Sequence, residues 1–362
     1  MKRLVCFHLF NDYSGSPKVL RMVLERLAEK EMQIDLVTSK GEGALNDLNK
    51  YENIHFCGYS YRFSSNPVIT LLRYICVQVY IFFFSFRYLF SKGSVFYINT
   101  ILPVGAALAG RIMGKKVIYH YHENAFVKGT FYRILAGLMQ ILATRIICVS
   151  AYQKSFLKRT KEVYVIPNAV SEDFIARLCP DSQHAFDRKR VLMLGSLKRY
   201  KGTLEFMELA RQLKDYRFEL VLNETEENVE VFRKENQMDA IDNLTIYSRQ
   251  KDVAPFYNRA SIVLNLSDKS QFIETFGLTA LEAMSAGLPV IVPTVGGIAE
   301  MVTDGVNGYK IDVHDIDKIA AHICLILSNR SLYCRLANNA LTYSQNFSIG
   351  KMSDAVLSLL DG

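Results

Sequence analysis

The sequence predicts an α/β protein built from two Rossmann-like domains, and three observations support this prediction. The chain has 362 residues, more than a usual single core, and 50% of them are hydrophobic, which is enough to bury two cores. Short apolar runs rich in β-formers alternate with longer stretches of helical periodicity, as a parallel sheet covered by helices requires. This alternation pauses in a polar stretch between Asn168 and Arg190, which predicts a domain boundary there.

The predicted strands fall into one series before the pause and a second series after it. In the first domain we expect strands at residues 3–9, 33–38, 53–57, 94–98, 116–120, 145–149 and 162–166. In the second domain we expect them at residues 191–194, 218–222, 243–247, 261–265 and 289–292. The predicted domains are residues 1–168 and 169–345, followed by a C-terminal helix within residues 346–362.

The most informative segment for function is residues 274–300, which reads E-T-F-G-L-T-A-L-E-A-M-S-A-G-L-P-V-I-V-P-T-V-G-G-I-A-E. Glu274 and Glu282 lie on either side of Phe276-Gly277-Leu278, where an apolar run with helical spacing begins. A helix that starts near Gly277 offers unpaired N–H groups and the positive end of its dipole to a phosphate. Carboxylates beside a bound diphosphate are suited to accept hydrogen bonds from sugar and ribose hydroxyls. This arrangement indicates a site for a sugar nucleotide.

A second predicted phosphate-binding element is the loop that leaves the first strand of the second domain, G-S-L-K-R-Y-K-G from Gly195 to Gly202. Gly195 permits a close approach of the backbone, and Lys201, just before a helix, can reach a bound anion. In the first domain, a strand ends at H-Y-H-E-N, where His120 and His122 share one face by alternation. Either a buried structural pair or a histidine that faces the ligand explains this motif.

These segments resemble the E-x7-E signature of retaining glycosyltransferases with the GT-B architecture, most closely family 4. The matching features are the Phe-Gly after the first glutamate, the turn that starts at Gly287, the Gly296-Gly297 pair and Glu300. The resemblance implies an α/β fold with GT-B architecture, in which two Rossmann-like domains face a central cleft. It also implies that the C-terminal helix, residues 346–362, crosses back to the first domain and couples the two halves.

The resemblance implies a role for each matched residue of the second domain. Glu282 is expected to bind the ribose, Glu274 the donor-sugar hydroxyls, and Lys201 the diphosphate together with the N–H groups around Phe276, Gly277 and Leu278. Ser196 stands where the family usually has arginine. Arg199 either replaces that missing cation or points to solvent, so loss of charge stabilisation at the leaving group is one expected consequence.

In the first domain the family generally has a Gly-Gly loop after the first strand. Here Ser14 replaces the first glycine and Gly15 matches the second. His122 matches the strand-end histidine that contacts the transferred sugar, which makes it a catalytic residue along with Lys201 and Glu274. Ser150 and Asn168 match positions that we treat as structural.

Residues 68–90 form a helix that is apolar nearly all round and is interrupted by Arg73, Gln78 and Arg87. Burial between the sheet and other helices explains it, and so does a position in a membrane interface. The chain has a net charge of +7, and the first domain carries the excess of Lys and Arg. We therefore expect the protein to contact an anionic membrane. No sequence motif indicates that it binds nucleic acid.

The resemblance therefore implies a metal-independent retaining glycosyltransferase with no cofactor. It would transfer a sugar from a nucleotide diphosphate sugar, with UDP favoured over GDP, to a glycan or lipid-linked acceptor in surface polysaccharide synthesis. The seven cysteines lack the spacing of a metal site, and the N-terminus lacks the pattern of a signal sequence. We therefore expect a cytoplasmic protein, either free or at the inner face of the membrane. Two alternatives are an epimerase or hydrolase of sugar nucleotides on the same fold and a catalytically silent subunit that binds a partner.

Overall fold

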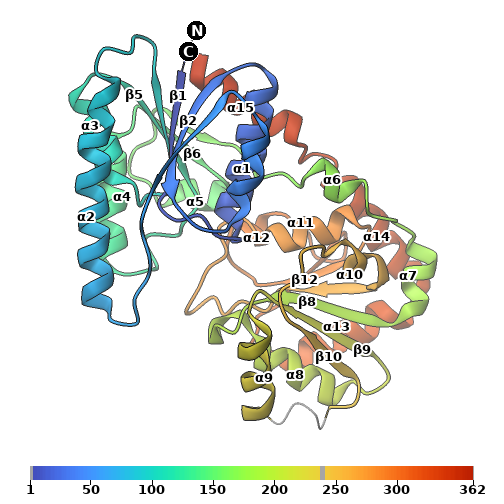
Figure 1. Cartoon of the computed structure of the whole chain (residues 1–362). Helices are drawn as coiled ribbons and strands as arrows, with labels where there is room; N and C mark the ends of the chain where they lie inside the picture. Colours follow the sequence, from blue (N-terminus) through green and yellow to red (C-terminus); the bar gives the residue numbers. More distant parts are fainter. Residues whose placement is uncertain (1–2, 237–240, 362) are drawn as a thin grey trace. The chain divides into compact units, whose positions relative to one another are not determined.

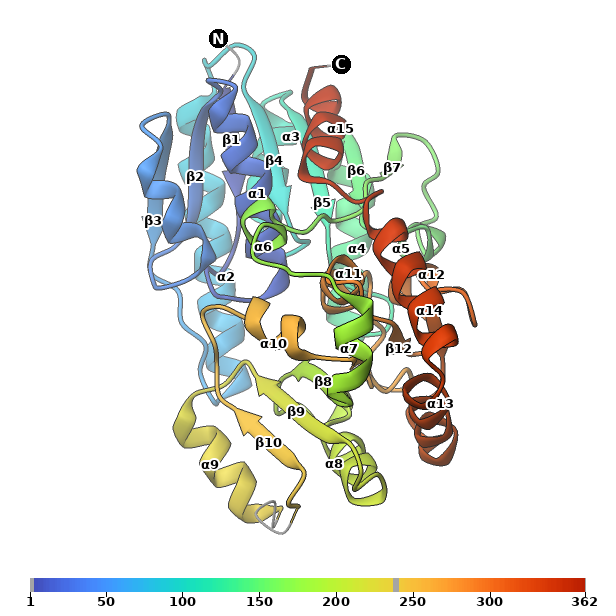
Figure 2. The same ribbon diagram turned by 90° about the vertical axis from the view of Figure 1, so that its right-hand side faces the viewer.

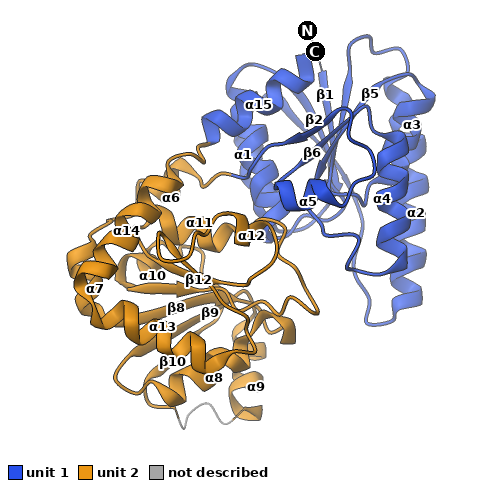
Figure 3. Ribbon diagram, turned by 180° about the vertical axis from the view of Figure 1, so that it is seen from behind, with its two compact units in different colours: residues 1–168, 349–362 blue, residues 169–348 orange. Residues whose placement is uncertain are grey.

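The computed structural model describes residues 3–236 and 241–361, and the chain folds into two compact units (Figure 3). Unit 1 consists of residues 1–168 together with the C-terminal residues 349–362, and unit 2 consists of residues 169–348. Each unit is a parallel β-sheet with helices packed on it.

The sheet of unit 1 has seven parallel strands in the order β3-β2-β1-β4-β5-β6-β7 (Figure 1). Their bounds are β1 Arg3–Phe7, β2 Gln33–Ser39, β3 Ile54–Tyr59, β4 Val95–Asn99, β5 Lys116–Tyr121, β6 Arg145–Cys148 and β7 Val163–Val165. The central strands are buried on both faces, which is why they read as continuous apolar runs.

The helices of unit 1 are α1 Gly15–Glu29, α2 Pro67–Ser85, α3 Val104–Ile112, α4 Thr130–Leu142, α5 Ala151–Ser155 and α15 Ile349–Asp361. Short 3-10 helices cover residues 44–50 and 86–88. Side chains of α2, α3 and α4 form one core cluster with one face of the sheet. Helix α15, the last element of the chain, lies beside α1 (Figure 2).

The C-terminal helix α15 is held on unit 1 near its middle and at its C-terminal end. Lys30 at the end of α1 donates to Asp354 at 2.6 Å. Near the C-terminus of α15, Arg145 donates to the carbonyl oxygen of Leu359 at 2.5 Å and Lys116 to that of Leu360 at 3.3 Å. Cations at these carbonyl groups satisfy acceptors that lack an intrahelical partner and complement the helix dipole.

The sheet of unit 2 has six parallel strands in the order β10-β9-β8-β11-β12-β13. Their bounds are β8 Arg190–Gly195, β9 Arg217–Leu222, β10 Leu244–Tyr247, β11 Ile262–Leu264, β12 Val290–Val292 and β13 Gly308–Lys310. The helices are α6 Glu172–Ile175, α7 Ser182–Arg188, α8 Thr203–Gln212, α9 Glu226–Glu235, α10 Ala254–Arg259, α11 Leu278–Ser285, α12 Gly297–Glu300, α13 Ile316–Ser328 and α14 Arg330–Ser344. A 3-10 turn covers residues 199–201.

The structure confirms the predicted fold class, and every predicted strand is present within two residues at each end. One strand, β13, was missed because its three residues, Gly-Tyr-Lys, form no apolar run. In both sheets the strand order reverses next to the first strand, between β1 and β4 and between β8 and β11. Ligands of such sheets bind beyond the carboxyl ends of the strands at these reversals, so the loops after these four strands carry the candidate site.

The packing of α15 yields a test of stability. Val356 is fully buried, so Val356→Ala removes two methyl groups from the core of unit 1 and is expected to cost about 2 kcal/mol in free energy of unfolding. The measurement is the denaturant midpoint of unit 1. Exposed Ser358 on the same helix provides the control, Ser358→Ala, which should shift stability by no more than about 0.5 kcal/mol. Equal effects of the two changes would contradict the packing described.

Candidate functional site

Lys201 and Glu274 meet at the strand reversal of unit 2. Lys201 follows β8 and Glu274 follows β11, and the Lys201 Nζ lies 2.5 Å from the Glu274 Oε1. Ser267 donates a second hydrogen bond to the same carboxylate oxygen at 3.1 Å. The two residues stand 73 positions apart in the sequence, and the sheet order brings them together. Unit 2 therefore places a cation and a carboxylate where its fold is suited to bind a ligand.

Aromatic stacking and a backbone contact hold the two loops that carry this ion pair. Tyr200 and Phe272 stack with ring centroids 4.8 Å apart, and the Lys201 ammonium lies 4.3 Å from the centroid of Phe272. The N–H of Asp268 donates to the carbonyl oxygen of Tyr200 at 2.8 Å. These contacts limit the freedom of the lysine, so its charge is held in place by packing as well as by Glu274.

The surroundings of Glu274 keep its carboxylate ionised. Burial alone raises the pKa of Glu274, but the charge of Lys201 and the hydrogen bonds from Lys201, Ser267 and Asn265 outweigh it and hold that pKa below its ordinary value. A carboxylate that remains an acceptor at neutral pH is suited to hydroxyl donors.

The start of α11 lies directly after Glu274, and its cap is a glycine for a structural reason. Gly277 has φ +95°, and a Cβ there would lie 2.5 Å from a side-chain carbon of Ile298. Both the backbone conformation and the close approach exclude a side chain. The N–H of Gly297, the first residue of α12, donates to the carbonyl oxygen of Glu274 at 2.9 Å. The N–H groups of Leu278 and Thr279 precede Ala280 and Leu281, which donate to the carbonyl oxygen of Gly277, and N–H groups at the start of a helix are suited to an anion.

Glu282 lies one turn into α11 and is positioned by a buried tyrosine. The hydroxyl of Tyr257 on α10 donates to the Glu282 Oε2 at 2.6 Å. Burial, together with the adjacent Glu282 carboxylate, raises the pKa of Tyr257 well above its ordinary value, so the tyrosine stays a donor. Tyr257 was not predicted from sequence. Its helix shows no motif, and the only signal is an aromatic residue with a hydroxyl in an apolar pattern.

The remaining predicted residues of unit 2 have distinct positions. Phe276 is buried, with its ring centroid 6.0 Å from that of Phe347, so its side chain supports the loop. Gly195 ends β8, and a Cβ there would touch Lys201. Ser196 follows in the loop. Arg199 pairs with Glu205 of α8 at 2.7 Å and is largely exposed, so its guanidinium is directed to that helix.

In unit 1 the loop after β1 is folded tightly onto the loop after β2. Asp12 accepts from the N–H of Ser14 at 2.9 Å, just before Gly15 starts α1. Asn11, which was not predicted as a site residue, is buried and accepts from the N–H of Leu45 at 3.1 Å. The polar Asn-Asp pair after an apolar strand was the sequence signal for this loop.

Asn99, at the end of β4, joins two histidines, His8 and His122, at the strand reversal of unit 1. His122 Nε2 lies 2.9 Å from the Asn99 Oδ1, and the Asn99 Nδ2 lies 3.1 Å from His8 Nδ1. The amide oxygen can only accept, so His122 carries its proton on Nε2. Asn99 was missed in the sequence, although a lone asparagine that ends an apolar strand was a usable signal.

These histidines are neutral at physiological pH. Burial lowers the pKa of His8 to about 4 and that of His120 to about 3. Burial, with charge repulsion from His120 and His8, holds the pKa of His122 well below its ordinary value. The rings of His120 and His122 lie 4.1 Å apart, and Tyr97 bonds to His120 at 2.7 Å. His120 is thus the buried structural partner, and His122 is the half-buried one.

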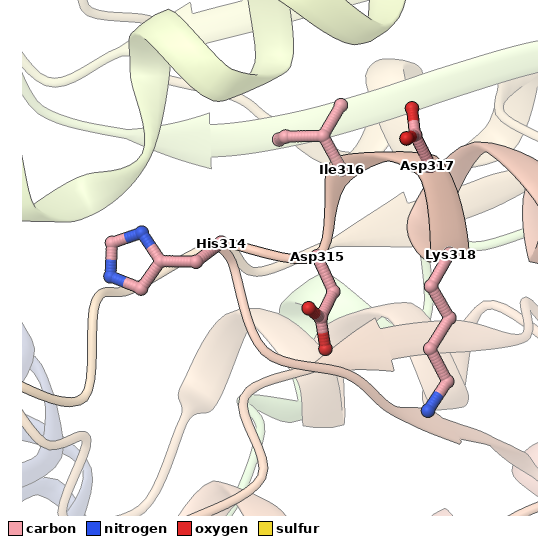
Figure 4. Close-up of a pocket in the computed structure, with 5 residues that line it drawn as sticks. All are labelled: His314, Asp315, Ile316, Asp317 and Lys318. Carbon is pink, nitrogen blue, oxygen red and sulfur yellow. The ribbon is translucent and has the colours of Figure 1, made fainter.

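Two further features bear on ligands. A pocket at the start of α13 is lined by His314, Asp315, Ile316, Asp317 and Lys318 (Figure 4), and His314 also pairs with Asp268 at 3.4 Å. Among residues 3–236 and 241–361, no group of three or more His, Cys, Asp or Glu side chains could hold a metal ion.

Comparison with protein families identifies the chain. Residues 13–174 match the profile of "Glycosyltransferase Family 4", and residues 179–342 match that of "Glycosyl transferases group 1". The chain belongs to glycosyltransferase family 4. Its two matched regions correspond to the two units, so the family assignment covers both halves of this glycosyltransferase.

Relatives of this glycosyltransferase share moderate identity. An uncharacterized glycosyltransferase of Methanocaldococcus jannaschii is 28% identical over 253 residues, which cover 68% of each chain. The D-inositol 3-phosphate glycosyltransferase of Kribbella flavida is 35% identical over 95 residues, 26% of this chain and 22% of that protein.

Solved structures support the two-domain fold. HepE of Anabaena, in complex with UDP and glucose, superposes with a TM-score of 0.77 at 18% identity and covers 100% of both chains. Sucrose-phosphate synthase of Thermosynechococcus elongatus gives a TM-score of 0.78 at 18% identity, covering 99% of this chain and 98% of that one. At this level of identity the likeness establishes the GT-B fold.

The Lys201–Glu274 pair predicts a pH dependence of stability. A folded-state pKa below the unfolded value stabilises the fold above the unfolded pKa, and this contribution is lost as the pH falls through the folded pKa. Glu274→Gln should therefore cost about 1–3 kcal/mol at neutral pH and show a smaller loss of stability on acidification below the ordinary pKa of a carboxyl group. Urea unfolding of unit 2 across that pH range measures both. The control is Glu227→Gln on exposed α9, and a wild-type acid profile retained in Glu274→Gln would contradict the prediction.

Asn99 yields a prediction for the protonation of His122. In Asn99→Asp, a carboxylate replaces the amide next to the ring, so the pKa of His122 should rise by about 1–3 units because an adjacent negative charge favours the imidazolium. NMR titration of the histidine side chains measures the shift. Asn338→Asp, the same change at an exposed position of α14, should leave the pKa of His122 unchanged. An unaltered titration in Asn99→Asp would show that Asn99 does not control the ring.

Proposed function

We propose that this glycosyltransferase moves a sugar from a nucleotide diphosphate sugar to a hydroxyl of a glycan or lipid-linked glycan. The donor is a UDP-sugar in preference to a GDP-sugar, the anomeric configuration is retained, and neither metal nor cofactor takes part. The setting is surface polysaccharide synthesis, such as lipopolysaccharide or capsule, in the cytoplasm at the inner face of the membrane.

The observation that carries this proposal is the arrangement around the start of α11. Lys201 lies 2.5 Å from Glu274 just before the helix, and Glu282 lies one turn inside it. A cation and a helix N-terminus are suited to a diphosphate, and the two flanking carboxylates are suited to hydroxyls. A nucleotide diphosphate sugar contains all three groups: ribose, diphosphate and sugar.

The chemistry expected of these residues is stabilisation of the leaving group. As the bond between the anomeric carbon and the diphosphate oxygen breaks, negative charge grows on that oxygen, and Lys201 and the first N–H groups of α11 would stabilise it. Glu274 and Glu282 would hold the sugar and the ribose in position. In the retaining mechanism implied by the family, the acceptor attacks from the side of the leaving group and its proton passes to a phosphate oxygen, so no protein nucleophile is assigned.

Unit 1 would contribute His122. Its ring is neutral, and the unprotonated nitrogen of a neutral imidazole is a hydrogen-bond acceptor, the kind of group that suits a hydroxyl of the transferred sugar. A neutral histidine is compatible with a donor that is already bound through its charges in unit 2. Gly15, at the start of α1, would allow the close approach of the donor phosphates that the family pattern implies.

The solved neighbours support the donor and the setting by analogy. HepE of Anabaena was solved with UDP-glucose, TarM of S. aureus with UDP and a GlcNAc-bearing glycerol, and WaaB is a lipopolysaccharide outer core galactosyltransferase. Peripheral contact with an anionic membrane would bring the enzyme to a lipid-linked acceptor.

One observation favours the alternative of a catalytically silent subunit. Ser196 stands in place of the usual arginine, and Arg199 pairs with Glu205, so Lys201 is left as the cation beside Glu274. Weaker binding of the diphosphate would follow from the loss of one cation. An epimerase or hydrolase would consume the donor without an acceptor.

The test is a thermal-shift panel of UDP, GDP, ADP and their sugar conjugates. Binding confined to the native state stabilises it by about 2.7 kcal/mol at a hundredfold excess of ligand over its dissociation constant. We expect UDP and UDP-sugars to raise the melting temperature of the wild type. The shift should be lost in Glu282→Gln, which keeps an acceptor for Tyr257 and so preserves the local hydrogen bond.

The control variant is Glu227→Gln on α9, which should retain the full shift. A shift confined to GDP would overturn the preference for UDP. If no nucleotide raises the melting temperature of the wild type, the donor site does not function in the isolated chain, and a catalytically silent subunit replaces this proposal. Consumption of donor that is independent of any added glycan would instead favour the hydrolase.

A further inference from the structure

The helix layer of α2, α3 and α4 presents two apolar faces where a surface layer needs only one. On α2 the residues Tyr74, Val77 and Ile81 belong to the core of unit 1. The opposite stripe, Val68, Leu72, Ile75, Val79 and Phe83, is also apolar, and each of these side chains is 48–67% exposed. The spacing of three and four residues puts this second stripe on one side of the helix. The sheet accounts for the first stripe but not for the second.

The exposed apolar side continues on the neighbouring helices. Helices α2 and α3 pack together, as do α3 and α4 (Figure 1). On α4 the exposed stripe is Ile134, Leu138 and Ile141, with Ile141 73% exposed, and on α3 it includes Ile112 at 62%. Exposed apolar residues scattered singly need no explanation, but stripes on adjacent helices mark an interaction surface.

Helix α2 is held in the fold as a layer helix. The segment Pro67–Tyr88, which contains α2, is long and apolar enough to cross a membrane by length and composition. A stretch of 18 residues within it has a mean hydropathy of 1.8, and 28% of that stretch is buried. The side chain of Gln78 accepts from the N–H of Gly105 at the start of α3 at 3.0 Å, and the Tyr74 hydroxyl donates to Leu102 at 2.8 Å. A Cβ on Gly105 would lie 2.2 Å from the carbonyl oxygen of Gln78. These contacts fix α2 against α3 and the loop before it, so a membrane would meet the outer stripe of α2 along its length.

The charge of this region identifies the partner. Between Glu52 and Glu162 the sequence contains 14 Lys and Arg and a single acidic residue, Glu123. The Glu123 carboxylate, just after His122, accepts a hydrogen bond from the N–H of Ile101. The exposed cations of the layer and its connections are Arg73, Arg87, Lys92, Arg111, Lys128 and Arg133. In the sequence, Arg73 follows Leu72 and Arg111 precedes Ile112, so exposed cations alternate with residues of the apolar stripes.

We propose that the outer side of α2, α3 and α4 docks in the interface of an anionic lipid bilayer, with the apolar stripes at the acyl boundary and the arginines and lysines at the headgroups. An apolar face bordered by long cationic side chains is the pattern of interfacial helices. A second copy of this chain fits less well, because it would bring the same cations together without acidic partners. The inference deepens the proposed function, on which it rests for the use of a lipid-linked acceptor, but the surface belongs to unit 1 and contains none of the residues proposed to bind the nucleotide.

The test is flotation of the full chain with vesicles of phosphatidylcholine alone and with equimolar phosphatidylcholine and phosphatidylglycerol. We expect binding to the anionic vesicles that weakens with salt. The double variant Leu72→Gln/Phe83→Gln should weaken binding about tenfold or more, since each change removes an apolar side chain from the acyl boundary. Lys92→Gln/Arg111→Gln should weaken it by about fivefold for each cation removed.

The matched control is Val231→Gln/Leu325→Gln, which places the same substitutions on exposed apolar residues of unit 2 and should leave vesicle binding unchanged. The melting temperature and the nucleotide shift of each variant separate this surface from the donor site. Vesicle binding without a nucleotide shift would support the docking surface while the proposed donor site fails. Equal vesicle binding by the wild type, by Leu72→Gln/Phe83→Gln and by Lys92→Gln/Arg111→Gln would overturn the inference. A dimer in solution that dissociates only in Leu72→Gln/Phe83→Gln would assign the surface to a second copy instead.

Discussion

Close contact between the loops that follow β8, β11 and β12 is the constraint on which the site of unit 2 depends. A Cβ on Gly202 would lie 2.2 Å from the carbonyl oxygen of Leu266, and a Cβ on Gly296 would lie 2.5 Å from that of Glu274. Backbone can approach backbone this closely only where there is no side chain. The first contact joins the Lys201 loop to the Glu274 loop, and the second joins the Glu274 loop to α12. Without them, the two members of the ion pair would be carried by loops that move independently.

Much of the fold could be predicted from local patterns, because the central strands are buried on both faces and are apolar throughout. The strand β13 escaped prediction since Gly308–Lys310 has no such run, and its place is set by pairing with β12. Chain order also says nothing about the strand order within a sheet. The reversal between β8 and β11 is what brings Lys201 and Glu274 together, and that is a property of the tertiary fold.

The sequence predicted some residues of the candidate site and missed others. The predicted residues lie in continuous motifs, and the missed ones do not. Glu274, Gly277 and Glu282 fall within one continuous segment, so spacing was enough to place them around a helix start. Asn99 and Tyr257 act through partners 23 and 25 positions away, and neither sits in a motif. Helix α2 shows a similar limit. Its apolar pattern predicts a helix but cannot tell a buried side from an exposed one, because both of its sides are apolar.

The direct contact between Lys201 and Glu274 has a consequence within the proposed function. A lysine that binds one carboxylate has a stronger partner in a diphosphate, which carries more negative charge and would also lie at the first turn of α11. The lysine would therefore exchange Glu274 for phosphate when a donor binds. Glu274 would keep its hydrogen bond from Ser267 but lose the charge of Lys201 that lowers its pKa, and new donors in place of the lysine would favour the ionised form. The hydroxyls of a sugar attached to that phosphate supply such donors. The same carboxylate can thus hold the lysine in position before binding and hold the sugar afterwards, which requires no rearrangement of the backbone held by Gly202 and Gly296.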